Sequence, residues 1–194
     1  MKHTRNHAVA IAMLASLATA PATALAESAT DTGSGTLSAA ARLNLRVTIP
    51  TFLYFRVGSL GGTVDTITFA PTETEVGDGN PIAGTGGDAG ASGANVAVRS
   101  NAGQITILES NDGGVGGLGT GAGNISLSEI TVTSDNGALD APVLSDGGGN
   151  YSAVTLNAGN VTSRTAVWTY AYDNTTTPAN GDYDAEITYT ATNL

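Results

Sequence analysis

Carboxylates are the main groups in this chain that could act as a general acid or base. The sequence has no Cys, and its one Lys and two His are Lys2, His3 and His7. The rest of the chain therefore lacks the residues that several kinds of site require. It excludes serine or cysteine catalysis with a His or Lys base, Schiff-base chemistry, and zinc sites built on Cys or His. A glycosidase-like carboxylate pair stays formally open, but no spacing singles out two of the glutamates, so we expect no enzymatic activity. These glutamates are Glu73, Glu75, Glu109, Glu129 and Glu186.

Several loops place Asp or Asn beside Gly, at 78–80, 111–113, 135–137 and 146–147. Oxygen ligands on such loops can hold calcium outside the cell. Tight turns require the same residues for their own backbone geometry, and none of these loops has the full alternating Asp pattern of a calcium loop. We therefore expect turns and no cofactor, with calcium in these loops as the alternative.

An aromatic pair of segments stands near the end of the chain. Residues 163–172 and 183–192 both alternate as strands do, and the connection between them contains Pro178 and Gly181. We predict a hairpin in which aromatic side chains on one face contact each other across the strands. A sandwich core is the preferred interpretation because the chain has a single Trp, and a sugar-stacking surface is the alternative. The aromatic residues are Trp168, Tyr170, Tyr172, Tyr183 and Tyr189.

Residues 37–57 alternate apolar and polar side chains, the period of a strand with one buried face. Pro50 cannot donate a hydrogen bond to a sheet, so it marks an edge, a bend or a junction of strands. The apolar face before Pro50 consists of Leu37, Ala39, Ala41, Leu43, Leu45, Val47 and Ile49. We expect these residues to form the first strand of the domain.

The other face of this first segment carries three of the five arginines that follow residue 26, namely Arg42, Arg46 and Arg56. The last segment carries carboxylates on one face, and same-face neighbours in a strand lie only about 7 Å apart, so these carboxylates repel each other unless compensated. First and last strands are often neighbours in sandwiches. We therefore predict a charge ladder that pairs Arg42 and Arg46 with Asp184 and Glu186.

Other segments with strand character are separated by Gly, Asn, Asp and Pro, at 63–70, 94–99, 103–109, 124–133 and 151–157. No segment has a convincing helical period, and β-branched residues dominate. The apolar parity changes between Leu127 and Ile130, which predicts a bulge. We expect an all-β, immunoglobulin-like antiparallel β-sandwich of about 7–9 strands. Long flexible Gly-rich loops are expected at 84–93 and 113–123.

The first 26 residues have the pattern of a secretory signal peptide: a basic start, an apolar run from Ala8 to Ala20, and Ala24-Leu25-Ala26. The run is too short and alanine-rich for an integral membrane span. We expect a flexible segment at 27–36 and a single domain at 37–194, exported to the periplasm, the cell surface or the medium. After the leader, the chain has five Arg and 17 carboxylates, so its net charge is strongly negative. A negative protein repels the phosphates of nucleic acid, which is therefore not expected as a partner.

The segments 127–148 and 168–183 are similar to those of an uncharacterised secreted β-sandwich family of Gram-negative bacteria. The two ends of the chain also resemble chaperone–usher fimbrial subunits, through the leader, the alternating last strand and a glycine at Gly181. The chain departs from these pilin-like proteins in having Asn193 where a penultimate Tyr is usual, and in lacking their disulfide.

The fimbrial resemblance implies assembly by strand addition, in which an alternating N-terminal strand completes the sandwich of the next subunit. Residues 37–49 would then be a donor strand rather than the protein's own first strand. We expect a non-catalytic secreted or surface structural protein that has itself or other envelope subunits as partners. A monomeric extracellular module for glycan binding or adhesion is the alternative.

Overall fold

The computed structural model describes residues 28–90, 92–112, 117–119 and 124–194. The chain divides into two units, Met1–Thr48 and Ile49–Leu194, and each is described by itself. The expected signal peptide at 1–26 lies outside the described residues. Within the described part, no helix has both the length and the apolar character that crossing a membrane requires.

The described part of the first unit, residues 28–48, contains no helix or strand, and every residue in it is exposed. One bond within it joins the Ser38 amide to the Asp31 carboxylate at 2.8 Å. The strand expected over 37–57 is therefore present only in its last part, as β1 (Leu53–Val57) in the second unit. The apolar residues between Leu37 and Ile49 take part in no strand of the described structure.

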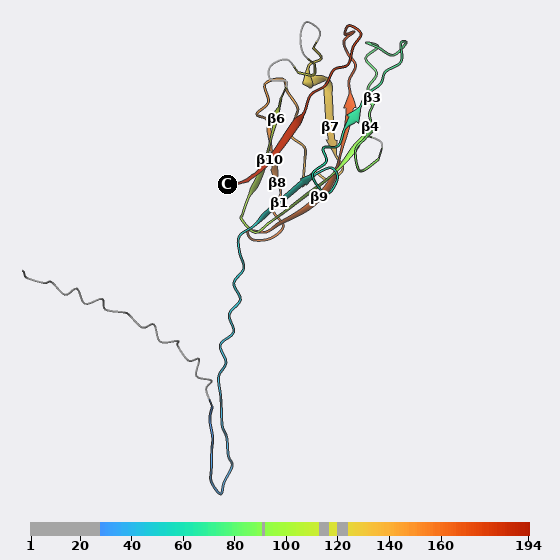
Figure 1. Cartoon of the computed structure of the whole chain (residues 1–194). Helices are drawn as coiled ribbons and strands as arrows, with labels where there is room; N and C mark the ends of the chain where they lie inside the picture. The colour runs from blue at the N-terminus through green and yellow to red at the C-terminus, as the bar shows by residue number, and fades with distance from the viewer. Residues whose placement is uncertain (1–27, 91, 113–116, 120–123) are drawn as a thin grey trace, which may run out of the picture. The chain divides into compact units, whose positions relative to one another are not determined.

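The second unit is a β-sandwich built from antiparallel strands (Figure 1). One sheet has the order β1–β5–β9, with β7 on the other edge of β9 and the short β3 also paired with β9. The other sheet has the order β10–β6–β8, and β2 and β4 form a small two-stranded ribbon. The bounds are β2 Ile67–Thr68, β3 Ile82–Ala83, β4 Thr85–Gly86, β5 Gly93–Ser100, β6 Ile105–Asn111, β7 Ile130–Ser134, β8 Tyr151–Val154, β9 Thr162–Tyr172 and β10 Ile187–Asn193.

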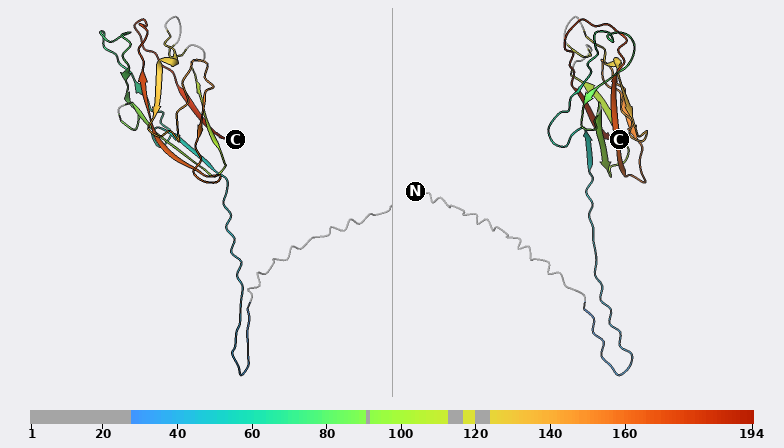
Figure 2. Two further views of the ribbon diagram at one scale, coloured as in Figure 1. Left: turned by 180° about the vertical axis from the view of Figure 1, so that it is seen from behind. Right: turned by 90° about the vertical axis from the view of Figure 1, so that its right-hand side faces the viewer.

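The all-β, sandwich-like character is confirmed, and the immunoglobulin-like strand order stays a prediction. The segments predicted at 94–99, 103–109 and 163–172 correspond closely to β5, β6 and β9. Strand β9 is the longest, and its two edges are covered by β5 and β7, which makes it the centre of its sheet. The views from behind and from the side in Figure 2 show both sheets running along the length of this unit.

The core lies between the two sheets. Alternate residues of β5, β6 and β9 point into it, because successive side chains of a strand face opposite sides. Trp168 of β9 is fully buried, and its indole N–H donates to the Leu139 carbonyl at 2.9 Å. Leu139 is also fully buried, in the connection between β7 and β8. This connection therefore contributes Leu139 to the core.

Two local predictions are corrected by the structure. The parity change in 124–133 is not a bulge: a short 3-10 helix, η2 (Leu127–Glu129), precedes β7 and turns the chain so that both Leu127 and Ile130 are buried. The described residues of the Gly-rich stretch 84–93 are not all loop. It contains β4, and the Gly87 amide donates to the Thr66 carbonyl at 3.1 Å. Most of the second Gly-rich stretch, 113–123, lies outside the described residues.

The core assignment predicts that Leu139→Ala lowers the free energy of unfolding by about 2–5 kcal/mol, because the change leaves a cavity beside the Trp168 indole. Val143→Ala is the matched control, since Val143 lies in the same connection but is 74% exposed; we expect a change of about 0.5 kcal/mol or less. Urea denaturation followed by the fluorescence of the single tryptophan measures both. Equal effects of the two substitutions would contradict this description of the core.

Candidate functional site

The aromatic residues predicted to form a hairpin are not on neighbouring strands. β9 belongs to one sheet, whereas β10 pairs with β6 in the other, so the predicted hairpin is wrong. The aromatic contact exists, but it runs across the core: the rings of Trp168 and Tyr189 meet edge to face, with centroids 5.1 Å apart. Trp168, Tyr170 and Tyr172 are all buried, so the core interpretation is correct and these rings offer no sugar-stacking surface.

Two tyrosine hydroxyls meet inside the same contact, where the Tyr170 and Tyr189 oxygens lie 3.2 Å apart. Burial raises the pKa of Tyr189 well above its usual value of 10.0, and the neighbouring Tyr170 and Glu109 raise it further. Burial also raises the pKa of Tyr170. The sheets are therefore joined through hydroxyls that must stay neutral.

The start of the second unit is fixed by two side chains at the end of β5. The Asn101 amide group donates to the Pro50 carbonyl and accepts from the Phe52 amide, both at 2.9 Å. The Ser100 hydroxyl donates to the Phe52 carbonyl, also at 2.9 Å. Pro50 thus marks the junction between the exposed residues 37–49 and the anchored start of β1. Asn101 was missed in the sequence, although its position in Asn-Ala-Gly is typical of a turn.

Residues 37–49 keep their apolar side chains in solvent. Leu43, Leu45 and Val47 are 83%, 87% and 84% exposed. This is unusual, because a regular row of large apolar side chains left in water marks an interaction surface. The row alternates with polar residues, as a strand that will be covered on one face requires.

Each sheet also has an open edge. β10 pairs only with β6 and β1 only with β5 among the described residues. The inward side chains of β10 are Ile187, Tyr189 and Ala191; they pack on the core but are only partly buried. Their neighbours Ile105 and Ile107 on β6 are fully buried. The core is therefore less well covered beside β10 than at the centre of the sheet.

The predicted charge ladder requires the first and last strands to be neighbours in one sheet, and they are not. The first strand, β1, and the last strand, β10, lie in different sheets. Arg42 and Arg46 precede β1 and belong to no strand. Arg56, the third arginine on the polar face of residues 37–57, pairs with Asp88 at 3.8 Å. Asp184 and Glu186 remain exposed, and the amide of Glu186 donates to the Asp112 carboxylate at 2.7 Å.

The Asp and Asn residues of the turns are used by the fold. Asp78 accepts from the Asn80 amide at 2.8 Å, and this bond lowers the pKa of Asp78. Asp135 accepts from the Val167 amide at 2.8 Å, and Asp146 from the Leu127 amide at 2.6 Å. No group of three or more His, Cys, Asp or Glu within the described ranges is placed to hold a metal ion. The turn interpretation is supported at each of these three carboxylates.

The glutamates that could have formed a catalytic pair have separate surroundings. Glu75 accepts from the Thr72 amide at 2.7 Å, which lowers its pKa. Glu129 accepts from the amide and hydroxyl of Thr175. Glu109 is fully buried in β6, and Glu73 and Glu186 are exposed. The first two therefore fix local chain geometry.

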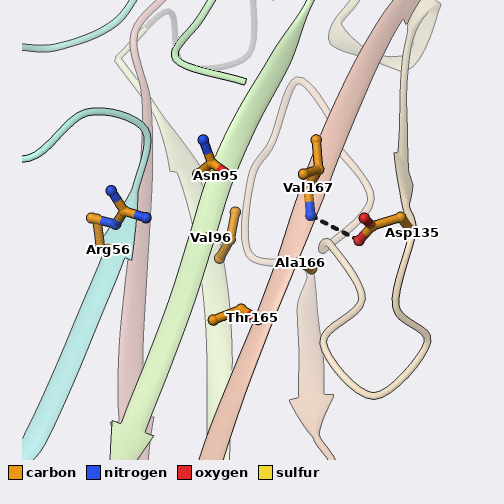
Figure 3. A pocket seen from close by; sticks show the side chains of 7 residues that line it. All are labelled: Arg56, Asn95, Val96, Asp135, Thr165, Ala166 and Val167. Carbon is orange, nitrogen blue, oxygen red and sulfur yellow. Dashed lines mark hydrogen bonds between the residues drawn. The ribbon is translucent and has the colours of Figure 1, made fainter. Parts of the chain in front are cut away.

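Two shallow hollows mark the described surface. The first, of about 200 Å³, lies on the outer face of the β1–β5–β9 sheet and is lined in part by Arg56, Asn95 and Thr165. Figure 3 shows Asp135 at its rim, bonded to the Val167 amide. The second, of about 230 Å³, lies beside β7 and Val143. Both are below the 300 Å³ or so at which small-molecule sites begin.

No family model, no curated protein and no solved structure matches this chain. Any proposal about its function therefore has to be argued from the fold and the features described above.

The tyrosine contact predicts instability at high pH. The unfolded chain ionises its tyrosines near pH 10, whereas Tyr189 resists ionisation in the folded state. Stability is therefore complete below about pH 10 and falls as the pH rises above that value. Tyr189→Phe should flatten this decline and cost about 1 kcal/mol at neutral pH through the lost hydrogen bond.

Urea midpoints measured between about pH 8 and pH 11.5 test this prediction. Tyr151→Phe is the control, because Tyr151 is 73% exposed and should leave the pH profile unchanged. A Tyr189→Phe protein with the same alkaline decline as the wild type would contradict it.

Proposed function

We propose that this protein is a non-catalytic structural subunit of the bacterial cell surface that assembles by strand addition. The observation that carries the proposal is the exposed, alternating apolar row between Leu37 and Ile49, placed just before the anchored start of β1. Such a row gains stability only when another surface covers it. Strand addition would cover it and also satisfy its backbone groups with main-chain hydrogen bonds.

The edge of β10 is the acceptor that best fits this donor. An added strand would pair with the open backbone of β10 and cover its partly buried Ile187, Tyr189 and Ala191. Open edges are a liability that proteins protect unless they are used for pairing. A second copy of the chain supplies both the donor and the acceptor, so assembly can continue from copy to copy.

Charge supports the same pairing between copies. The polar face of the donor carries Arg42 and Arg46, and the residues that lead into β10 expose Asp182, Asp184 and Glu186. A ladder that cannot form between neighbouring strands of one domain could form between two subunits. Each exposed pair contributes only about 0–1 kcal/mol, so the charges would select the register more than the affinity.

Export supports the surface location. The expected leader at 1–26 would release the donor segment near the new N-terminus, as strand donation requires. The resemblance of the two chain ends to chaperone–usher subunits agrees with this arrangement. The residues after the leader lack His, Lys and Cys, which removes the usual catalytic bases and nucleophiles.

Leu45→Asp should block assembly of the purified protein, because a charge would enter the apolar interface. We expect the association constant to fall at least about tenfold, the loss that follows from exposing one buried leucine. Asn44→Asp is the matched control: it adds the same charge on the opposite face of the same segment and should assemble nearly as well. Sedimentation velocity and electron microscopy of the three proteins measure the outcome.

Wild-type protein that stays monomeric at high concentration, and that does not exchange with a synthetic peptide of residues 37–49, would overturn the proposal. Equal assembly of the Leu45→Asp and Asn44→Asp variants would overturn the role of this apolar row.

A further inference from the structure

A buried carboxylate stands in the core without a counter-charge. Glu109 of β6 has no exposed surface, and it shares the inward face of the strand with Ile105 and Ile107. Its register partner on β10 is Tyr189, a neutral side chain. The described residues provide no Arg within ion-pair distance of Glu109. A charge in such a place is stable only when it is paired with a charge of opposite sign or neutralised.

The hydrogen bonds of Glu109 only partly compensate for its burial. Oε1 accepts from the amide and the side chain of Asn150 and from the Ser145 hydroxyl, at 3.3, 3.2 and 3.4 Å. These distances are long beside the usual 2.9 Å or so. Oε2 is buried and has no hydrogen-bond partner. The carboxylate therefore keeps one oxygen available to a ligand.

A second oxygen without a partner lies two residues further along the same strand. The Asn111 side-chain N–H₂ donates to the carbonyls of Ser145 and Asp146 at 3.1 and 3.2 Å, which fixes the amide orientation. Its Oδ1 is buried and accepts no bond. Residues i and i+2 lie on one face of a strand about 7 Å apart, so Glu109 and Asn111 can contact one ion.

The loop 145–150 covers this part of β6. The Glu109 amide donates to the Asn150 carbonyl at 2.9 Å, and the Gly149 amide donates to the Glu109 carbonyl at 3.0 Å. Gly148 has a φ of 61°, a left-handed conformation that favours glycine at this turn of the loop. The Asn150 side chain also donates to the Ser145 hydroxyl at 2.8 Å. The loop is thus held against the strand by bonds at both of its ends.

We propose that Glu109, Asn111 and the loop 145–150 form a binding site for a single calcium ion. Carboxylate, amide and hydroxyl oxygens are the ligands that Ca²⁺ accepts in flexible geometry, whereas Mg²⁺ demands a stricter octahedron. The ion partners both free oxygens and supplies the missing counter-charge. This proposal is independent of strand addition.

The site has few charged ligands, so its affinity should be that of extracellular calcium modules, with a Kd of about 10⁻⁴–10⁻³ M. The purified protein is first treated with a chelator, and its thermal midpoint is then followed against CaCl₂, MgCl₂ and NaCl at matched ionic strength. We expect a saturable rise with CaCl₂, a smaller rise with MgCl₂ and none specific to NaCl. Isothermal titration with CaCl₂ should give one site per chain.

Glu109→Gln keeps the shape of the side chain and removes its charge. It should raise the midpoint of the chelator-treated protein and abolish the response to CaCl₂. Glu73→Gln is the matched control, because Glu73 is exposed and lies outside the site; its response should equal that of the wild type. Should Glu109→Gln fail to fold, Asn111→Ala provides the test, with calcium affinity expected to fall about tenfold or more.

A wild-type protein whose midpoint does not respond to CaCl₂ would overturn the proposal. A full calcium response in the folded Glu109→Gln or Asn111→Ala variant would overturn the assignment of the site.

Discussion

The two sheets of this domain are joined where the Trp168 indole of β9 meets the Tyr189 ring of β10, and the rest of the structure depends on that contact. The chain has no cysteine, so no disulfide ties one sheet to the other. The indole N–H also holds the Leu139 carbonyl, which draws the connection after β7 into the core. One large side chain therefore organises three parts of the chain that are distant in sequence, and its packing takes the place of the disulfides common in small exported domains.

This contact covers the centre of the sandwich, and the edges of the sheets are less well covered. β9 is central and covered on both sides, whereas β10 and β1 each have one edge that no described strand pairs with. Within the second unit, the residues that precede β1 are held by the bonds of Asn101 to Pro50 and Phe52. A covered centre with uncovered edges is the arrangement that the proposed assembly by strand addition requires. The buried Glu109 lies opposite Tyr189 in the β6–β10 pair, so any ion bound there would also stabilise the strand at the open edge.

Strands β5, β6 and β9 could be predicted from the sequence because their apolar residues alternate, as in 163–172. How the strands pair could not. The connection from β9 toward β10 is fixed by Asn174, which is buried with a φ of 56° and accepts from the Gly77 amide, 97 residues away. No local pattern reveals such a partner, so two strands close in sequence were expected to form a hairpin. The alternation of Ile105, Ile107 and Glu109 did place a glutamate on an apolar face, a signal of burial that composition alone conceals. The exposure of residues 37–49 could not be predicted either, because alternation is the same whether a strand is covered by its own domain or by another.

The anchoring of Pro50 and Phe52 also has a mechanical consequence. A pulling force that acts on Pro50 and Phe52 along the direction of β1 loads their bonds to Asn101 and the pairing of β1 with β5. The five residue pairs that join β1 to β5 lie side by side across that direction, so they share the load in shear instead of opening one after another. Unzipping a sheet breaks its bonds singly, and shearing requires several to break together. The pairing of β1 with β5 therefore resists a force along the strand better than a force that peels β1 away from its edge.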